Sequence, residues 1–201
     1  MTRCTIALAL VAAACGKGDK ADGGGGKAEP AGKGSPATTV TIDAAAVNAL
    51  VPEPLKAKLV FEQRDVVLDQ GTKHTFAVAA PKGWKQRSTM FGALEPESGG
   101  FGTEMKVGNN CDGACEPKDW ATVSDKVHFA QLAKATVVKD DKATGKRTMI
   151  ATQGDETHVI VVWWTEGASE YFSCTAKLGA ELKDAAPAFE KACQAVGYTK
   201  G

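Results

Sequence analysis

Cysteines are the residues of this chain best able to do chemistry, because a thiolate can form a disulfide, take an acyl group or bind a metal ion. Two cysteines lie near the N-terminus beside an apolar run, and four lie in the remaining sequence. They are Cys4, Cys15, Cys111, Cys115, Cys174 and Cys193. The reaction that each cysteine undergoes depends on the cellular compartment, which the N-terminal residues indicate.

The N-terminal segment has the features of an export signal. Arg3 precedes an apolar run from Ile6 to Ala14, which is too short to span a bilayer and has the length of a signal-peptide core. We therefore predict a signal peptide over residues 1–14. The run ends in Val-Ala-Ala-Ala-Cys, which resembles the lipobox of bacterial lipoproteins, with Ala12 where leucine is usual. The resemblance implies that Cys15 is diacylated and becomes the mature N-terminus.

A lipid anchor at Cys15 would hold the protein at a membrane. Two or more acyl chains, at about 0.8 kcal/mol per buried methylene, anchor a protein durably. Gly16 follows in place of the aspartate that retains lipoproteins at the inner membrane of enteric bacteria, so the resemblance favours the outer membrane. The domain would then lie in the bacterial cell envelope, in the periplasm or at the cell surface. The alternative is a plain secretory signal cleaved after an Ala-x-Ala site, with Cys15 incidental.

A glycine-rich segment follows the anchor. Between Gly16 and Pro36 the chain has eight glycines and no side chain bulkier than lysine. Such a segment buries too little apolar area to offset its ordering entropy. We predict the lipidated cysteine and a flexible tether over residues 15–40, with a reach of about 25 Å. A single domain is predicted over residues 41–201.

The four domain cysteines predict two disulfide bonds in an exported chain, for which three pairings are possible. Cys174 lies on the buried face of a predicted strand, and Cys193 on the buried face of the helix that follows. This geometry favours a bond between them, which would close a loop of nearly twenty residues and contribute about 3 kcal/mol. Cys111 and Cys115 would then close their own short loop.

The loop around Cys111 and Cys115 also permits metal-binding interpretations. With a histidine, the two cysteines could bind zinc, but their spacing fits no common zinc pattern and export favours oxidation. Residues 110–113, Asn-Cys-Asp-Gly, have a weak similarity to a calcium loop, yet the last ligand position holds Asp119 rather than glutamate. We predict a turn there, with no metal site.

No catalytic or cofactor motif is found in the sequence. His74, His128 and His158 lie on two predicted strands and a helix, and none belongs to a His-Glu-x-x-His motif. Residues 144–148 lack the upstream glycine of a phosphate loop, and residues 99–102 lack the third glycine of a dinucleotide motif. We therefore predict no catalytic residue and no cofactor.

Composition narrows the function classes further. With 201 residues, 43% of them hydrophobic, the chain can build one domain with a substantial core. The 24 basic and 24 acidic side chains balance, so no net charge attracts nucleic acid. Glu95 and Glu97 flank a proline and are expected at a solvated strand edge.

The stretch from residue 157 to residue 198 organises the predicted fold. Residues 157–165 are apolar on both alternating faces, which predicts a central strand covered on both sides. Residues 170–178 alternate apolar and polar side chains, which predicts a half-buried strand. Apolar residues at helical spacing then predict a helix ending at Val196. Trp163 and Trp164 point to opposite faces, so at least one is core, and the other could line a sugar- or peptide-binding surface.

The preceding residues predict short elements separated by turn residues. Helices are predicted at residues 44–50, capped by Asp43, and at residues 119–134, whose apolar stripe would lie on the sheet. A six-residue turn is expected at residues 140–145. Strands are predicted at residues 58–68, 73–80, 90–95, 101–107, 135–139 and 146–152.

This order of elements resembles the PsbP-like superfamily, which includes DcrB-type bacterial lipoproteins and the oxygen-evolving P subunit of photosystem II. The resemblance covers about residues 58–198. It rests on Phe76-x-Val78-x-x-Pro81-x-Gly83-Trp84 and on the final strand and helix. It implies an α+β fold, with a mostly antiparallel sheet and helices packed on it as an α/β/α sandwich. It implies no particular activity, and the four domain cysteines depart from the better-known members.

Together these features predict a non-catalytic, membrane-tethered envelope lipoprotein. Its sheet or helix surface would serve a protein partner, and it would bind no nucleic acid. The alternative is a tethered binding module for a small ligand, a metal or a cell-wall fragment, and an enzyme is the third possibility. A pocket that joins a tryptophan to polar groups would favour the binding module. Two titratable side chains within hydrogen-bond reach in a cleft would favour the enzyme.

Overall fold

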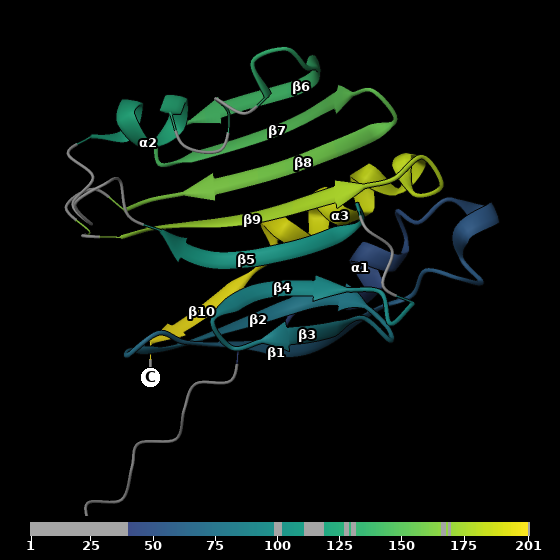
Figure 1. The fold of residues 1–201 in the computed structure, drawn as a ribbon, viewed down its shortest axis with the longest axis horizontal. Coiled ribbons are helices and arrows are strands. Elements are labelled where there is room, and N and C mark those ends of the chain that lie inside the picture. The colour runs from purple at the N-terminus through teal and green to yellow at the C-terminus, as the bar shows by residue number, and fades with distance from the viewer. Residues whose placement is uncertain are drawn as a thin grey trace, which may run out of the picture. The chain divides into compact units, whose positions relative to one another are not determined.

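The computed structural model describes residues 40–98, 102–110, 119–126, 129, 132–165, 168 and 170–200. Residues 38–201 form one compact unit. The fold is of the α+β class, and its strands pair antiparallel (Figure 1). The predicted signal peptide, the predicted lipidation site Cys15, and the predicted Cys111 to Cys115 disulfide lie outside the described residues.

A three-stranded sheet has the order β1-β2-β10. Strands β1 (Phe61–Asp69) and β2 (Lys73–Pro81) form the predicted hairpin, with Phe61 opposite Pro81. The predicted terminal helix is wrong at its end, because α3 (Ala186–Gln194) stops short of Val196 and the chain enters β10 (Gly197–Lys200). Strand β10 pairs with β2 because Tyr198 packs on Phe76 and Phe172, contacts that no local pattern in the sequence specifies.

A seven-stranded sheet has the order β3-β4-β5-β9-β8-β7-β6. Strand β8 lies between β9 and β7, which confirms the predicted central strand. The short β3 was not predicted, because its residues are polar. The strands are β3 (Lys85–Ser88), β4 (Phe91–Glu95), β5 (Glu104–Asn110), β6 (Thr136–Ala143), β7 (Lys146–Gln153), β8 (Glu156–Trp163) and β9 (Tyr171–Leu178).

The predicted six-residue turn at residues 140–145 is wrong. Strand β6 continues to Ala143, and only Thr144 and Gly145 connect it to β7. Gly145 has a φ of 74°, and a Cβ there would lie 2.7 Å from the Trp164 carbonyl oxygen. A tight two-residue turn with glycine in the left-handed region therefore lets the charged strand residues pair.

The helices are short. Helix α1 (Ala44–Asn48) begins as predicted at Asp43, whose carboxylate accepts a 3.0 Å hydrogen bond from the Ala46 amide. Helix α2 (Trp120–Lys126) is shorter than the predicted helix over residues 119–134, because residues 132–135 form a turn. The described residues also include two single-turn 3₁₀ helices, η1 (Glu53–Leu55) and η3 (Lys183–Ala185). No helix in the described part of the chain has the length and apolarity needed to cross a membrane.

The seven-stranded sheet carries a separate apolar cluster on each face. Along β8, Val159 and Val161 belong to the first cluster, which includes residues of both sheets, α1 and α3. Ile160 and Val162 belong to the second, which includes Val123 of α2. Since side chains alternate along a strand, the two clusters lie on opposite faces. The two-sided apolar pattern of β8 therefore reflects burial on both sides.

The predicted bond between Cys174 and Cys193 is confirmed. It joins β9 to α3, with the two Cα atoms 5.2 Å apart and both cysteines fully buried. Helix α3 contacts β2, β8 and β9, and it passes behind the seven-stranded sheet in Figure 1. Next to the disulfide, the Phe189 ring lies edge-on to Phe61, with ring centroids 5.0 Å apart.

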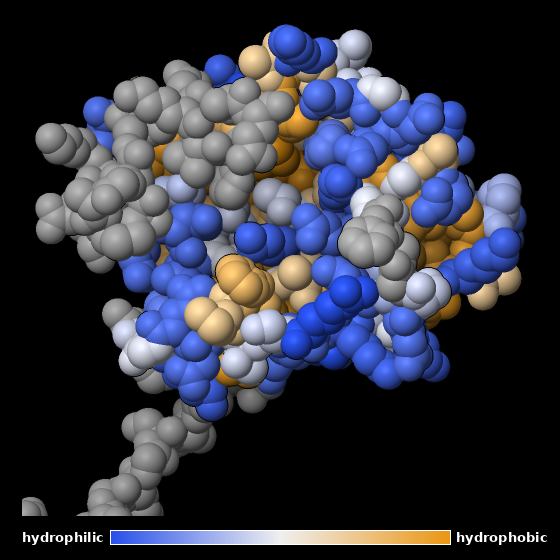
Figure 2. Space-filling model, viewed as in Figure 1, coloured by the Kyte–Doolittle hydropathy of each residue, from blue (hydrophilic) through white to orange (hydrophobic). Residues whose placement is uncertain are grey.

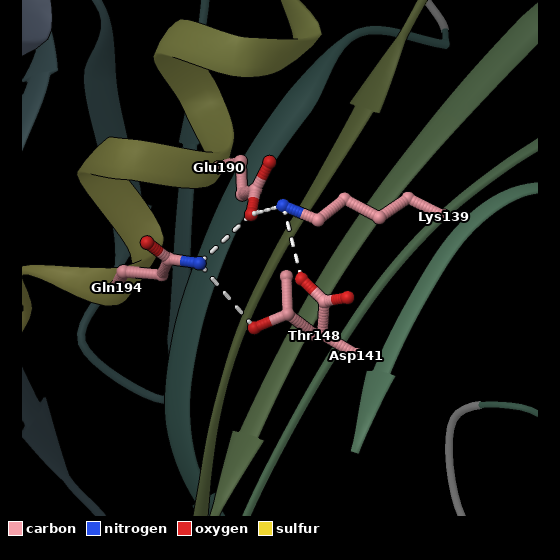
Figure 3. Close-up of polar contacts among 5 residues, drawn as sticks. All are labelled: Lys139, Asp141, Thr148, Glu190 and Gln194. Atoms are coloured by element: carbon pink, nitrogen blue, oxygen red, sulfur yellow. Dashed lines mark hydrogen bonds and ion pairs between the residues drawn. The ribbon is translucent and has the colours of Figure 1, made fainter. Parts of the chain in front are cut away.

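Charged side chains attach the edge strand β6 to its surroundings. Lys139 Nζ lies 2.7 Å from Glu190 Oε1 of α3 and 3.1 Å from Asp141 Oδ2 (Figure 3). Gln194 Nε2 donates to the same Glu190 oxygen at 2.8 Å. Hydrogen bonds from Lys139 to the two carboxylates raise the pKa of its ammonium, so this lysine stays charged and is a poor nucleophile.

The other face of β6 carries a more buried pair. Arg147 Nε donates to Asp140 Oδ1 at 2.7 Å, and its terminal nitrogen donates to Oδ2 at 2.8 Å. The guanidinium also donates to the Ser124 carbonyl of α2 and lies 3.8 Å from the centroid of the Phe129 ring. These bonds from Arg147 hold the pKa of Asp140 below its usual range. The pair connects the sheet edge to α2.

Candidate functional site

A groove lies on the face of the seven-stranded sheet that carries the second cluster. It consists of two hollows that share Thr175 of β9 as a lining residue. Among the described residues, polar side chains of β5 and β9 form its floor. We call these two hollows together the sheet groove.

The larger hollow, here the charged hollow, has a volume of about 400 Å³. The strand registers explain its composition, because Glu104 of β5 and His158 of β8 both stand opposite Lys177 of β9. Residues opposite one another share a face of the sheet. The polar residues that line the hollow are Glu104, Gln153, Glu156, His158, Thr175 and Lys177.

The charges of the described residues that line this hollow do not cancel. Lys177 Nζ lies 3.0 Å from Glu156 Oε1, which neutralises one carboxylate. His158 Nε2 lies 3.4 Å from Glu156 Oε2, but this buried nitrogen makes no hydrogen bond with any described residue. Burial lowers the pKa of His158, so the imidazole is neutral at pH 7. No ion pair or hydrogen bond of Glu104 is found among the described residues, so among these residues its carboxylate is uncompensated.

The smaller hollow, here the apolar hollow, has a volume of about 200 Å³ and lies beside the β3–β4 hairpin. Met90 and Phe91 line it with 58% and 57% of their surface exposed. Lys106 Nζ lies 5.9 Å from the centroid of the Phe91 ring. Figure 2 shows an apolar patch over this hairpin, surrounded by hydrophilic side chains. A Cβ at Gly92 would lie 1.9 Å from the Val107 carbonyl oxygen, so glycine permits the close approach of hairpin and β5.

Of the two adjacent tryptophans, Trp164 lies in the core, as predicted for at least one of them, and Trp163 is half-buried. The Trp164 indole donates to the Ala168 carbonyl at 2.9 Å. Trp163 stacks on Phe172, with centroids 5.9 Å apart, and lines a hollow of about 270 Å³ together with Lys146 and Gln194. This hollow joins a tryptophan to polar groups, as expected of a binding module.

His74 and Tyr198 are the titratable pair closest to the geometry expected of an enzyme. His74 Nδ1 lies 2.8 Å from the Tyr198 hydroxyl, and Asn109 approaches His74 Nε2 at 3.5 Å while donating to Glu170 at 3.1 Å. However, His74 is only 3% exposed, and burial, followed by the charge of Glu170, raises the pKa of Tyr198. The chain of polar groups joins β2 and β10 to β5, so it links the two sheets.

The other predicted candidates do not gather at one place. His128 lies outside the described residues. Asn110, considered for the calcium loop, ends β5 and donates its amide to Ser173 Oγ at 2.8 Å. Glu97 pairs with Lys85 at an exposed site. Within the described ranges, no group of three or more histidine, cysteine or acidic side chains is placed to hold a metal ion.

Sequence reasoning did not identify the sheet groove. Most of its lining comes from β4, β5, β8 and β9, with Leu68 of β1 and Gln153 of β7, and only the fold brings these residues together. Met90 and Phe91, two large apolar residues at a turn between polar stretches, were the one local signal. The sequence comparisons match this chain to no protein-family model and to no curated protein.

Proposed function

We propose that this chain is a non-catalytic lipoprotein of the bacterial cell envelope that serves as a protein-interaction or accessory module. The apolar run over residues 6–14 and the small residues before Cys15 support a signal peptide and lipidation. The disulfide between Cys174 and Cys193 supports export, because such bonds persist in oxidising compartments. On this proposal the anchor holds the domain at the outer membrane on its glycine-rich tether.

The proposal includes a PsbP-like α/β/α sandwich. Support comes from the β1–β2 hairpin, the corner at residues 81–84, the run of antiparallel strands and a final helix bonded to β9. At the corner, the Trp84 amide donates to the Pro81 carbonyl at 3.2 Å and the Trp84 side chain is buried. The β3 and β10 strands extend this arrangement.

The exposed apolar pair at the β3–β4 hairpin is the observation that carries the interaction role. Met90 and Phe91 leave more than half of their surface in water, beside a hollow in the sheet. Large apolar side chains gathered on a polar surface mark interaction sites, and aromatic side chains are frequent binding hot spots. Val137 and Val138 are exposed as well, but they precede the charged residues of the edge strand β6 and are not beside a hollow of the sheet groove.

Photo-crosslinking in living cells tests this role. The photoreactive residue p-benzoylphenylalanine in place of Phe91 should capture a discrete protein partner in the envelope fraction. The same residue in place of Glu62, which is exposed on β1, is the control and should capture none. Capture of nothing at position 91, or of the same proteins at both positions, would contradict the interaction role.

The second candidate function is a tethered binding module for a small ligand, a metal or a cell-wall fragment. The Trp163 hollow favours it, because an aromatic wall with a few polar groups is typical of ligand sites. Its volume of about 270 Å³ suits only a small ligand. A saturable change in tryptophan fluorescence on adding a muropeptide, lost in Trp163→Phe, would support this second function.

A further inference from the structure

We infer that the sheet groove binds an extended segment of a protein partner, with a basic side chain in the charged hollow and an apolar side chain against Met90 and Phe91. This inference rests on the proposed interaction function and specifies the chemistry of the partner. Two features carry it: the uncompensated carboxylate of Glu104 at one end and the exposed apolar pair at the other.

The charges at the groove favour a cation at its Glu104 end. Lys177 is already paired with Glu156, and the neutral His158 does not repel an incoming positive charge. Lys106, the other cation among the described lining residues, stands over the Phe91 ring in the apolar hollow. A guanidinium or ammonium group entering the charged hollow can therefore pair with Glu104 and with the second oxygen of Glu156.

The strand register gives the spacing of the two side chains. Ala93 pairs with Lys106 and Leu94 with Met105, so continuing this register sets Phe91 opposite Gly108. Glu104 and Gly108 are four residues apart on β5, roughly 14 Å at the rise of an extended strand. An extended partner segment spans this distance in four residues, and residues i and i+4 then point to the same side. The partner should carry its basic and apolar residues at that spacing.

Binding of defined peptides to the purified full-length chain in detergent tests the inference. The probe is a fluorescein-labelled Gly-Arg-Ser-Gly-Ser-Leu-Gly peptide, and fluorescence anisotropy reports its Kd. Two control peptides replace the arginine by glutamate or move the leucine one position closer. We expect saturable binding of the probe and at least fivefold weaker binding of both controls.

Matched variants locate the contact. Glu104→Gln and Phe91→Ser should each weaken probe binding at least fivefold. Glu62→Gln, on the three-stranded sheet, and Val138→Ser, on the β6 edge, should change it less than 1.5-fold. Unchanged binding in Glu104→Gln, no saturable binding of the probe, or equal binding of the glutamate peptide would overturn the inference.

Other occupants of the sheet groove give different results. If the sheet groove takes a second copy of the chain, unlabelled chain will displace the probe and the protein will dimerise at micromolar concentration. If it takes a glycan, chitotetraose will displace the probe. Either result overturns the inference. If a partner is captured in cells at position 91 but the probe peptide does not bind, the inference is overturned and the proposed function stands. If no partner is captured at position 91, the proposed function is contradicted.

Discussion

The centre of the seven-stranded sheet and its β6 edge are held by different interactions. At β8 and β9, apolar side chains cover the sheet and a disulfide fixes α3. At β6 nearly every residue is exposed, and ion pairs from Lys139 to Glu190 and from Asp140 to Arg147 attach the strand. Apolar burial has no charge interaction for salt to screen, whereas ion pairs between exposed charges are screened by it. The centre is therefore built for stability, and the edge responds to solution conditions.

The largest loss of stability is expected at the centre. Phe189→Ala removes a fully buried ring that contacts Phe61 and Trp84, and should lower the free energy of unfolding by about 3–5 kcal/mol. Phe91→Ala, on the exposed hairpin, is the control and should cost less than about 0.5 kcal/mol. Urea unfolding followed by circular dichroism measures both. Equal losses would contradict the division between core and surface.

Removing the disulfide should have the next largest effect. Cys174→Ala with Cys193→Ala should lower the free energy of unfolding by about 2–4 kcal/mol, because the bond constrains the unfolded chain. The comparison is made in a background carrying Cys111→Ser and Cys115→Ser. Reductant should lower the urea midpoint of that background and leave the quadruple variant unchanged. If neither the two Cys→Ala substitutions nor the reductant changes the urea midpoint, the disulfide is excluded as a major source of stability.

Asp140 and Asp141 lie on opposite faces of the edge strand β6, so substituting each residue tests one face separately. Asp140→Asn removes the carboxylate that accepts two hydrogen bonds from the buried Arg147 guanidinium and should cost about 1–3 kcal/mol. Asp141→Asn, whose side chain is 66% exposed, should cost less than about 0.5 kcal/mol. Thermal unfolding of the two variants measures the difference. The reverse order would show that the outer network around Lys139 holds the strand.

The smallest effect is a pH dependence from the charged hollow. Burial lowers the pKa of His158 in the folded chain below its ordinary value of 6.5. As the pH falls, His158 therefore takes up a proton in the unfolded chain at a higher pH than in the folded chain. The free energy of unfolding decreases as the pH drops from 6.5 through the folded pKa. Urea midpoints between pH 7 and pH 5 should decline in the native chain and decline less in His158→Gln. An identical slope in both would contradict the burial of this imidazole.

Patterns within single segments predicted the centre of the molecule well. The two-sided apolar pattern of β8 and the alternation in β9 specify burial directly, and α3 places Cys193 on the face that meets Cys174. The disulfide could therefore be predicted from two residues that are 19 positions apart.

The remainder depends on contacts between distant segments. The polar β3 has no apolar alternation, and β10 forms because Tyr198 meets Phe76 and Phe172 across the sheets. The sheet groove needs Glu104, His158 and Lys177 in register on three strands. Its parts look like ordinary solvated strand residues until the strand order is known.

Mass spectrometry of the intact protein from its native cells tests the central claim of export and anchoring most directly. We predict a mature chain that begins at Cys15, carries acyl groups on that residue and contains the Cys174 to Cys193 disulfide. A chain that still begins at Met1, with an unmodified Cys15 and free thiols, would contradict the account.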